Sequence, residues 1–346
     1  MGKQSFQTFR MLVGKLTLFR FAACLLLTVV FITAMSSCKS GMKSALSENV
    51  RIDTLYLTEA TSLADSIPGL VTGVSIINES VVLSLRKAEY AFAVFPLTFD
   101  SRFLLAGRHG RGPGEVLDVC SSSLIVEPEG FSFVDSYGKR HARLADGHIS
   151  ISSPEYSFMN DPAKNSFVEL STSFIDINTE NETDEYVVYD KTLSMKSYTG
   201  RFPDWGSSDD ALPQFLYMKF LSKLPGKDRF VAVYGHYPVI RICNSEGKPI
   251  REVYTYTDSF FGGISNVFYC CRPVANEDCI LALSQGGVPN SDHPELHMFD
   301  WKGNLLKTFV FDRPVDNFSV SFDYGKIVAY SSSSPYLLYC ADICFN

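Results

Sequence analysis

Apolar and polar residues alternate in short runs over most of the chain. Typical runs are Val81–Leu85, Arg229–Tyr234 and Cys279–Leu283. Asn, Asp, Gly and Pro residues typical of turns separate the runs, and no stretch keeps a helical period over three turns. The pattern therefore predicts an all-β chain.

A short phrase recurs along these strands: an apolar strand, an acidic residue or its substitute at a turn, and a return strand. The phrase falls at Pro96, Asp135, Asp190, Asn244, Asp300 and Ala341, with gaps of 39, 55, 54, 56 and 41 residues. This spacing is typical of the four-stranded blade of a β-propeller, so six copies predict six blades. The alternative is a pair of irregular β-sandwiches whose turns are similar by chance.

A propeller must also close its ring, because an open sheet leaves unpaired edges. The strand expected at Arg51–Leu57 is a candidate to complete the last blade, which ends at Cys340–Phe345. This pairing would fasten the two ends of the domain together.

The N-terminus has the pattern of a secretory signal. Residues 1–20 carry four basic residues and no acidic one, and residues 21–34 are uncharged and apolar. That run is short for a membrane-spanning helix, which needs about 20 residues. The sequence Met35-Ser-Ser-Cys38 then resembles a bacterial lipobox, which implies cleavage before Cys38 and lipidation of that residue. The alternative is an uncleaved anchor, and both place the remaining chain outside the cytoplasm.

We therefore expect a lipoprotein signal peptide at residues 1–37, a lipidated tether at 38–49 and the propeller at 50–346. Surface-exposed lipoproteins of the Bacteroidetes often carry an acidic cluster behind the lipidated Cys, whereas here Lys39 and Lys43 follow it. The expected location is thus the outer membrane of a bacterial envelope, facing the periplasm, with the membrane reached through the lipid.

Charge and cysteine content exclude some classes of partner. Without residues 1–37, the chain has 27 basic residues (31 less 4) against 38 acidic ones, a net charge of −11, which disfavours nucleic acid. Seven cysteines remain after Cys24 and Cys38 are set aside, so at least one is unpaired within the chain. Cys271 and Cys279 could face each other across a hairpin, but buried free thiols are the simpler expectation. Their spacing is not that of a zinc site.

The loop Gly107-Arg-His-Gly-Arg-Gly-Pro-Gly-Glu115 has the least usual composition in the chain. It is not a phosphate-binding loop, because Glu115 and Val116 replace the Lys and Ser or Thr that would hold phosphate and metal. It is not a dinucleotide fingerprint either, because a strand rather than a helix follows it. Two interpretations remain: a shaped loop whose Arg and Glu side chains pair with neighbouring loops, or one that lines a binding face.

Several patterns that could indicate catalysis are weak. The segment His293-Pro-Glu-Leu-His297 does not have the zinc-protease spacing, and Pro294 disfavours the helix that such a motif requires. No Gly-x-Ser-x-Gly elbow is present. The acids Asp204, Asp209 and Asp210 could act in pairs on glycosides, but exposed acids in loops are usually only solvated. We assign no catalytic residue, metal site or cofactor.

A collective binding face is more plausible, because propellers bind ligands at loops around their channel. Aromatic and arginine side chains are enriched at binding hot spots. The polar and aromatic residues of the atypical loops are Arg108, His109, Arg111, Glu115, Arg201, Asp204, Trp205, Tyr234 and His236. This hypothesis requires those loops to share one end of the ring.

Taken in series, several motifs resemble the TolB-like six-bladed β-propeller lipoproteins of the Bacteroidetes. They are the lipobox, the loop of residues 107–115, Phe202-Pro-Asp-Trp205, Tyr234-Gly-His236, residues 240–247 and Phe299-Asp-Trp-Lys-Gly-Asn304. The resemblance covers about residues 50–346 and implies the fold and an envelope location. It implies no activity and no catalytic residues.

Three functions are compatible with these observations. The first is a non-catalytic binding or scaffold module for an envelope protein, peptide or glycan. The second is a carbohydrate-active enzyme, a glycosidase or lyase, that uses carboxylates in the channel. The third is a partner of an envelope transport complex.

Overall fold

A computed structural model describes residues 43–44, 50–62, 69–100, 103–112, 114–145, 148–155, 166–193, 196–206, 210–255, 263–332 and 337–345. The expected signal peptide and Cys38 lie outside these residues. The contacts between residues divide the chain into two units, residues 1–43 and residues 44–346. The second unit contains the propeller. The described helix α2 (Pro213–Leu216) is short, and no helix in the described part has the length and hydropathy that a membrane crossing needs.

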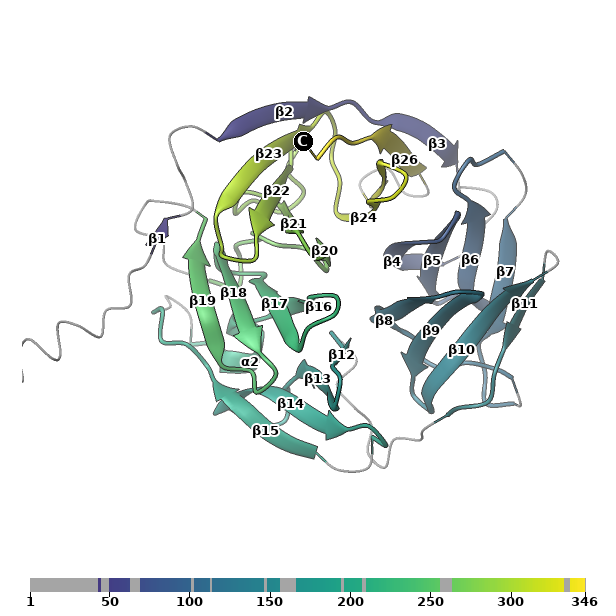
Figure 1. Cartoon of the computed structure of the whole chain (residues 1–346), viewed down its shortest axis with the longest axis horizontal. Coiled ribbons are helices and arrows are strands. Elements are labelled where there is room, and N and C mark those ends of the chain that lie inside the picture. Colours follow the sequence, from purple (N-terminus) through teal and green to yellow (C-terminus); the bar gives the residue numbers. More distant parts are fainter. Residues whose placement is uncertain are drawn as a thin grey trace, which may run out of the picture. The chain divides into compact units, whose positions relative to one another are not determined.

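Six sheets, each with four antiparallel strands, stand around a central axis, so the predicted six-bladed β-propeller is confirmed (Figure 1). The first three blades run in chain order from the inner to the outer strand. Blade 1 contains β4 (Leu70–Ile77), β5 (Ser80–Arg86), β6 (Tyr90–Pro96) and β7 (Leu104–Arg108). Blade 2 contains β8 (Cys120–Glu127), β9 (Gly130–Asp135), β10 (Gly138–Ala145) and β11 (His148–Ile151). Blade 3 contains β12 (Val168–Glu169), β13 (Ser173–Ile177), β14 (Asp184–Asp190) and β15 (Lys196–Arg201).

The other three blades follow the same order, with additions from the N-terminal segment. Blade 4 contains β16 (Lys219–Lys223), β17 (Arg229–Tyr234), β18 (Val239–Asn244) and β19 (Pro249–Tyr254). Blade 5 contains β20 (Val274–Ala275), β21 (Cys279–Ser284), β22 (Glu295–Asp300), β23 (Leu305–Phe311) and the added β2 (Arg51–Leu55). Blade 6 contains β24 (Asn317–Ser321), β25 (Lys326–Ser331), β26 (Leu337–Asp342) and β3 (Thr58–Ser62). A two-residue strand, β1 (Lys43–Ser44), spans the unit boundary.

The recurring phrase marks hairpin turns. The Oδ1 atoms of Asp190, Asn244 and Asp300 each accept hydrogen bonds from backbone N–H groups two to four residues later. Asp135 makes the same type of turn, but it follows the second strand of its blade, whereas the other three follow third strands. The gaps on either side of Asp135, 39 and 55 residues, are therefore unequal because its turn comes one strand earlier in the blade than the other turns do.

The N-terminal segment closes the ring, but the expected pairing was wrong in detail. The strand that completes the last blade is β3, which pairs antiparallel with β26. Strand β2 instead pairs parallel with β23 of blade 5, and Lys307 Nζ lies 2.8 Å from Asp53 Oδ2 across that pair. The segment therefore binds two adjacent blades.

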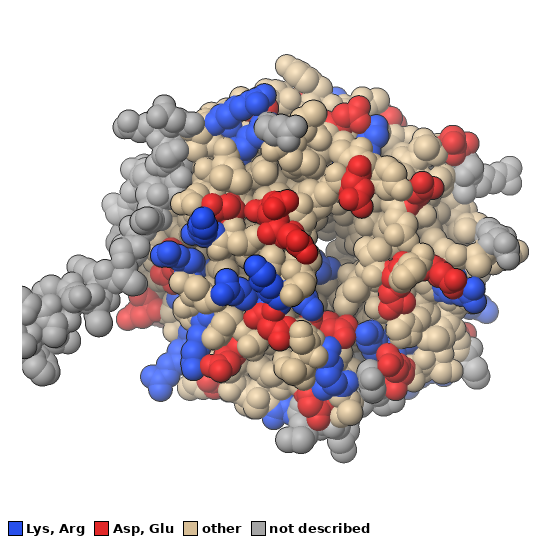
Figure 2. All heavy atoms as spheres, in the orientation of Figure 1, with Lys and Arg blue, Asp and Glu red and all other residues tan. Residues whose placement is uncertain are grey.

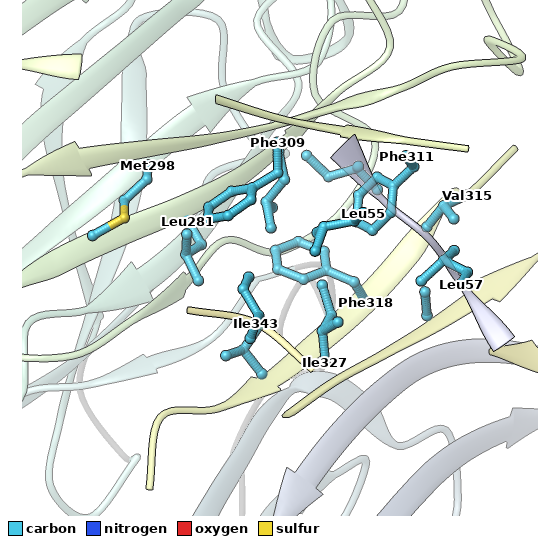
Figure 3. Packing of buried hydrophobic residues seen from close by; sticks show 14 of the residues in the cluster. Leu55, Leu57, Leu281, Met298, Phe309, Phe311, Val315, Phe318, Ile327 and Ile343 are labelled. Atoms are coloured by element: carbon cyan, nitrogen blue, oxygen red, sulfur yellow. The ribbon is translucent and has the colours of Figure 1, made fainter. Parts of the chain in front are cut away.

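Hydrophobic clusters fill each of the six interfaces between neighbouring blades. The cluster between blades 5 and 6 contains 17 buried residues, including Leu55 and Leu57 from the N-terminal segment, which pack beside Phe311 and Phe318 (Figure 3). The cluster between blades 2 and 3 contains only seven of the described residues. The seven cysteines beyond Cys38 are all free thiols, and four of them are buried.

We expect Leu57→Ala to lower the free energy of unfolding by about 2–5 kcal/mol, because it leaves a cavity in the cluster that joins the N-terminal segment to two blades. Urea denaturation measures this change. The control is Ile52→Ala, because Ile52 is 68% exposed on the adjacent strand and its loss should cost less than about 0.5 kcal/mol. Equal losses in the two variants would contradict the packing described here.

Candidate functional site

A cavity of about 640 Å³ opens from the central channel between blades 2, 3 and 4. The inner strands β8, β12 and β16 contribute to its wall, and Arg272 and Ala275 contribute from the start of blade 5. Side chains from the second strands of blades 2 and 3, such as Phe133 and Phe174, also line it. The cavity thus extends outward into the interface with the smallest hydrophobic cluster.

The wall of this cavity is mainly apolar, with a few charged groups. Its apolar side chains include Leu124, Val126, Phe167, Leu170 and Pro225. Cavities of this size and character are typical of small-molecule binding sites. The face of the ring seen in Figure 2 is hollowed at its centre, with acidic and basic side chains intermixed around the hollow.

The described residues of the lining include four cations and one carboxylate. Glu169 Oε2 lies 3.0 Å from Lys139 Nζ, and Glu169 Oε1 lies 2.8 Å from Lys191 Nζ. The hydrogen bonds and charges of these two lysines outweigh the effect of burial and hold the pKa of Glu169 below its usual range. The other two cations are Lys223 and Arg272.

A second cavity of about 310 Å³ adjoins the first. The two share Leu124, Val126, Ser222, Arg272 and Ala275. Apart from Arg272, the described residues that line the smaller cavity are uncharged, and their polar atoms include hydroxyl and thiol groups. Arg272 therefore lies where the two spaces meet.

The loop of residues 107–115, predicted as part of a binding face, is braced from within. Glu115 Oε2 accepts a hydrogen bond of 2.6 Å from Gly112 N. A Cβ atom at Gly110 would lie 2.0 Å from the same oxygen, so only glycine allows the carboxylate to fold over the loop. Arg108 pairs with Glu89 at 3.5 Å, while Arg111 is exposed.

A further contact holds this loop to its own blade. His109 Nε2 lies 3.3 Å from Leu85 O, again within blade 1. Arg108 thus pairs with the turn between β5 and β6, whereas Glu115 pairs within its own loop.

Trp205, Tyr234 and Arg241 belong to a second group of contacts, between blades 3 and 4. Trp205 and Tyr234 meet edge to face with their ring centroids 4.7 Å apart, and the Arg241 guanidinium lies 4.6 Å from the Trp205 centroid. Tyr234 is fully buried and donates a hydrogen bond of 2.7 Å to Glu185 Oε1. Tyr234 is therefore part of the interior and presents no surface to a ligand.

The group includes buried charges that balance one another. Glu185 accepts hydrogen bonds from Lys219 Nζ at 2.6 Å and Arg241 Nη1 at 2.9 Å. Arg241 Nε also pairs with Glu252 Oε2 at 2.6 Å, and Trp205 Nε1 donates to the other oxygen of Glu252 at 3.2 Å. Two cations face two carboxylates here, as expected of a structural network.

The remaining predicted residues lie around this group. Arg201 and Asp204 are exposed, and His236 Nδ1 lies 2.6 Å from Asn266 O. The glycine loop and residues 202–218 each connect an outer strand to the next inner strand, and residues 235–238 join a second strand to a third. In antiparallel blades these connections open at the same end of the ring. Among the described residues, however, no hydrogen bond, ion pair or ring contact joins the glycine loop to Trp205 or His236.

The charged residues of the cavity were not predicted from the sequence. Lys139, Lys191 and Lys223 each lie beside a hairpin turn, where lysine is common and indicates nothing about function. Only Arg272 could have been singled out from the sequence. It is the one charged residue in the segment Tyr269-Cys-Cys-Arg-Pro-Val274, and an isolated charge in an apolar segment needs an explanation.

Asp176, on β13, is a fully buried acid in the interface between blades 2 and 3. Its Oδ1 accepts hydrogen bonds from Ser166 N at 3.2 Å and Ile177 N at 2.7 Å. Its Oδ2 has no partner among the described residues. Burial raises the pKa of Asp176 to about 7, despite these hydrogen bonds.

The fold is shared with solved structures of little sequence similarity. A member of the DUF4221 family from Bacteroides vulgatus superposes with a TM-score of 0.53 at 9% identity, covering 84% of this chain and 98% of that one. The calcium-binding protein regucalcin from Agrobacterium tumefaciens gives 0.50 at 10% identity, covering 85% and 96%. At such identities the likeness shows the propeller fold alone. The sequence matches no protein-family profile and no curated protein.

We expect the buried Asp176 to make stability depend on pH. The unfolded carboxyl loses its proton near pH 3.8 and the folded one near pH 7, so stability falls as pH rises between these values and then levels off. Asp176→Asn should remove this fall, which is on the order of a few kcal/mol. Urea unfolding from pH 4 to pH 8 compares the two proteins. Parallel stability curves would show that Asp176 is ionised in the folded state.

Proposed function

We propose that this protein is a non-catalytic binding module of the bacterial cell envelope, and that its ligand enters the cavity of the central channel. The observation that carries the proposal is a space of about 640 Å³ with mainly apolar walls and a few charged groups. A space of this volume accommodates a small molecule, or the end of a peptide or glycan. The residues predicted to form a binding face give less support to the proposal. Those of the glycine loop make their contacts within blade 1, those around Trp205 lie between blades 3 and 4, and Tyr234 is buried.

The lining supports binding better than glycoside cleavage. Most glycosidases use two carboxyl groups, placed on either side of the bond that breaks. Among the described residues that line the larger cavity, Glu169 is the only acid, and two lysines hold it. The described lining of the smaller cavity contains no acid. The same lack of carboxylates gives no support for a calcium site like that named for the regucalcin neighbour.

The location in the envelope is part of the proposal and rests on the N-terminal sequence. Lipid on Cys38 would hold the propeller at the outer membrane, facing the periplasm, with residues 39–49 as a tether. The motifs quoted above likewise support an assignment to the TolB-like lipoproteins. In that setting the ligand would belong to an envelope peptide, glycan or protein.

We expect the purified propeller to bind one equivalent of the uncharged dye N-phenyl-1-naphthylamine, whose fluorescence rises in apolar surroundings. Ala275→Trp should weaken binding by about tenfold or more, because Ala275 lines both cavities and an indole would fill part of the space. Fluorescence titration measures the affinity. The matched control is Ala145→Trp, because Ala145 is exposed at the end of β10. Equal affinity in the two variants would place the dye outside the channel and contradict the proposal.

We also expect Cys38→Ala to abolish lipid attachment in a bacterial host, because lipid is added to that sulfur. Metabolic labelling with an alkyne fatty acid, followed by separation of membranes from soluble protein, measures both incorporation and location. The variant should lose the label and the mature-size product, while Cys24→Ala, within the apolar run, should keep both. Labelling that persists in Cys38→Ala would refute the lipobox assignment.

A further inference from the structure

The charge of the cavity is opposite in sign to that of the whole protein. The chain has a formal net charge of −7. Among the described residues, the lining of the larger cavity has four cations against Glu169, an excess of three positive charges. A positive cavity in an acidic protein attracts anions to that site in preference to the rest of the surface.

The nearby acids neutralise only part of this excess. Lys139 and Lys191 share Glu169, so one positive charge remains between them. Asp228 lies near the rim, where a hydrogen bond from Ser171, and then the charges of Lys223 and Lys191, lower the pKa of its carboxyl group. No described carboxylate lies within 4.0 Å of Lys223, and Asp228 is outside the lining.

Arg272 has the least compensated charge. Among the described residues, no carboxylate lies within 4.0 Å of its guanidinium group. Its one hydrogen bond given by the structure runs from Nη1 to Leu124 O at 3.5 Å, the outer limit for such a bond. A guanidinium has five N–H donors, and Arg272 lines both cavities, so donors beyond this one bond remain for a ligand there.

The surroundings of Arg272 make an unpaired charge costly. Arg272 is half-buried, and it lines both cavities. Burial lowers the pKa of Arg272 to about 10, which leaves it charged at neutral pH. A half-buried cation without a counter-charge is less favourable than a paired one, so an anion in the cavity would be stabilised here.

We propose that the channel cavity binds an amphipathic oxyanion, a carboxylate or phosphate group on an apolar body, with Arg272 as the anchor for the oxyanion. This inference rests on the proposed function, because it names the ligand class of the same cavity. Guanidinium groups bind carboxylate and phosphate in bidentate geometry. Lys223 adds positive charge to the lining, and side chains such as Leu124 and Phe167 receive the apolar body.

The test compares two dyes of similar shape. 8-Anilinonaphthalene-1-sulfonate carries an oxyanion, and N-phenyl-1-naphthylamine is its uncharged relative. The wild-type propeller should bind the sulfonate about tenfold more tightly or better, and added salt should weaken only the sulfonate. Arg272→Met should lower sulfonate affinity by about tenfold while leaving the uncharged dye unchanged.

Control variants separate charge from folding. Arg143→Met removes an exposed arginine that pairs with Glu129 at 2.8 Å on the outer part of blade 2, and it should bind both dyes like the wild type. Arg272→Lys keeps the charge and should retain most of the preference for the sulfonate. If Arg272→Met does not fold, Lys223→Met provides the same test. Its preference for the sulfonate over the uncharged dye should be weaker than that of the wild type, and added salt should weaken sulfonate binding to the wild type.

The outcomes distinguish the two proposals. Equal affinities for the two dyes, insensitive to Arg272 and salt, would overturn the anionic ligand class and leave the binding cavity intact. Failure of both dyes to bind the wild type would overturn the binding cavity as well. If the sulfonate binds as expected, competition by dodecanoate or by dodecyl phosphate identifies the preferred head group.

Discussion

The closure of the ring by the N-terminal segment is the constraint on which the rest of the structure depends. Strand β3 supplies the outer edge of blade 6 by pairing with β26, and β2 extends blade 5 by pairing with β23. Residues near the start of the propeller are thereby joined to strands more than 250 positions later. Without these pairings the last blade would expose an open edge, and the inner strands would not be held around a common channel.

A closed ring has to fill six interfaces with the side chains available, and this chain fills them unequally. Leu55, Leu57 and several phenylalanines make the interface of blades 5 and 6 a large apolar cluster. The interface of blades 2 and 3 has a smaller cluster and includes the buried Asp176. The channel widens into its larger cavity beside this interface. Among the described residues, the interface beside the space that we propose as a binding site has the smallest apolar cluster.

The fold could be predicted because its signals are local. Alternating hydropathy marks the strands, and Asp190, Asn244 and Asp300 recur because each accepts backbone hydrogen bonds in the same kind of turn. The same chemistry at Asp135 occurs one strand earlier in its blade, so turn chemistry alone cannot give the phase of each blade. Whether Arg51–Leu55 or Thr58–Ser62 closes the last blade depends on long-range pairing, and both segments have strand character.

The candidate site could not be predicted for a related reason. Lys139, Lys191 and Lys223 come from three blades, and each is an ordinary lysine beside a turn in the sequence. Only the closed ring brings them to one cavity with Arg272. The loop of residues 107–115 attracted attention by its composition, yet that composition is explained by the glycines that let Glu115 fold over the loop.

A crystal structure of the propeller with bound 8-anilinonaphthalene-1-sulfonate would show directly whether the channel cavity binds an amphipathic oxyanion. We expect the naphthalene ring against the apolar wall near Leu124 and Phe167, with the sulfonate within hydrogen-bond distance of the Arg272 guanidinium. A dye bound only on the outer surface of the blades, or at the loops near Arg111 and Trp205, would contradict it.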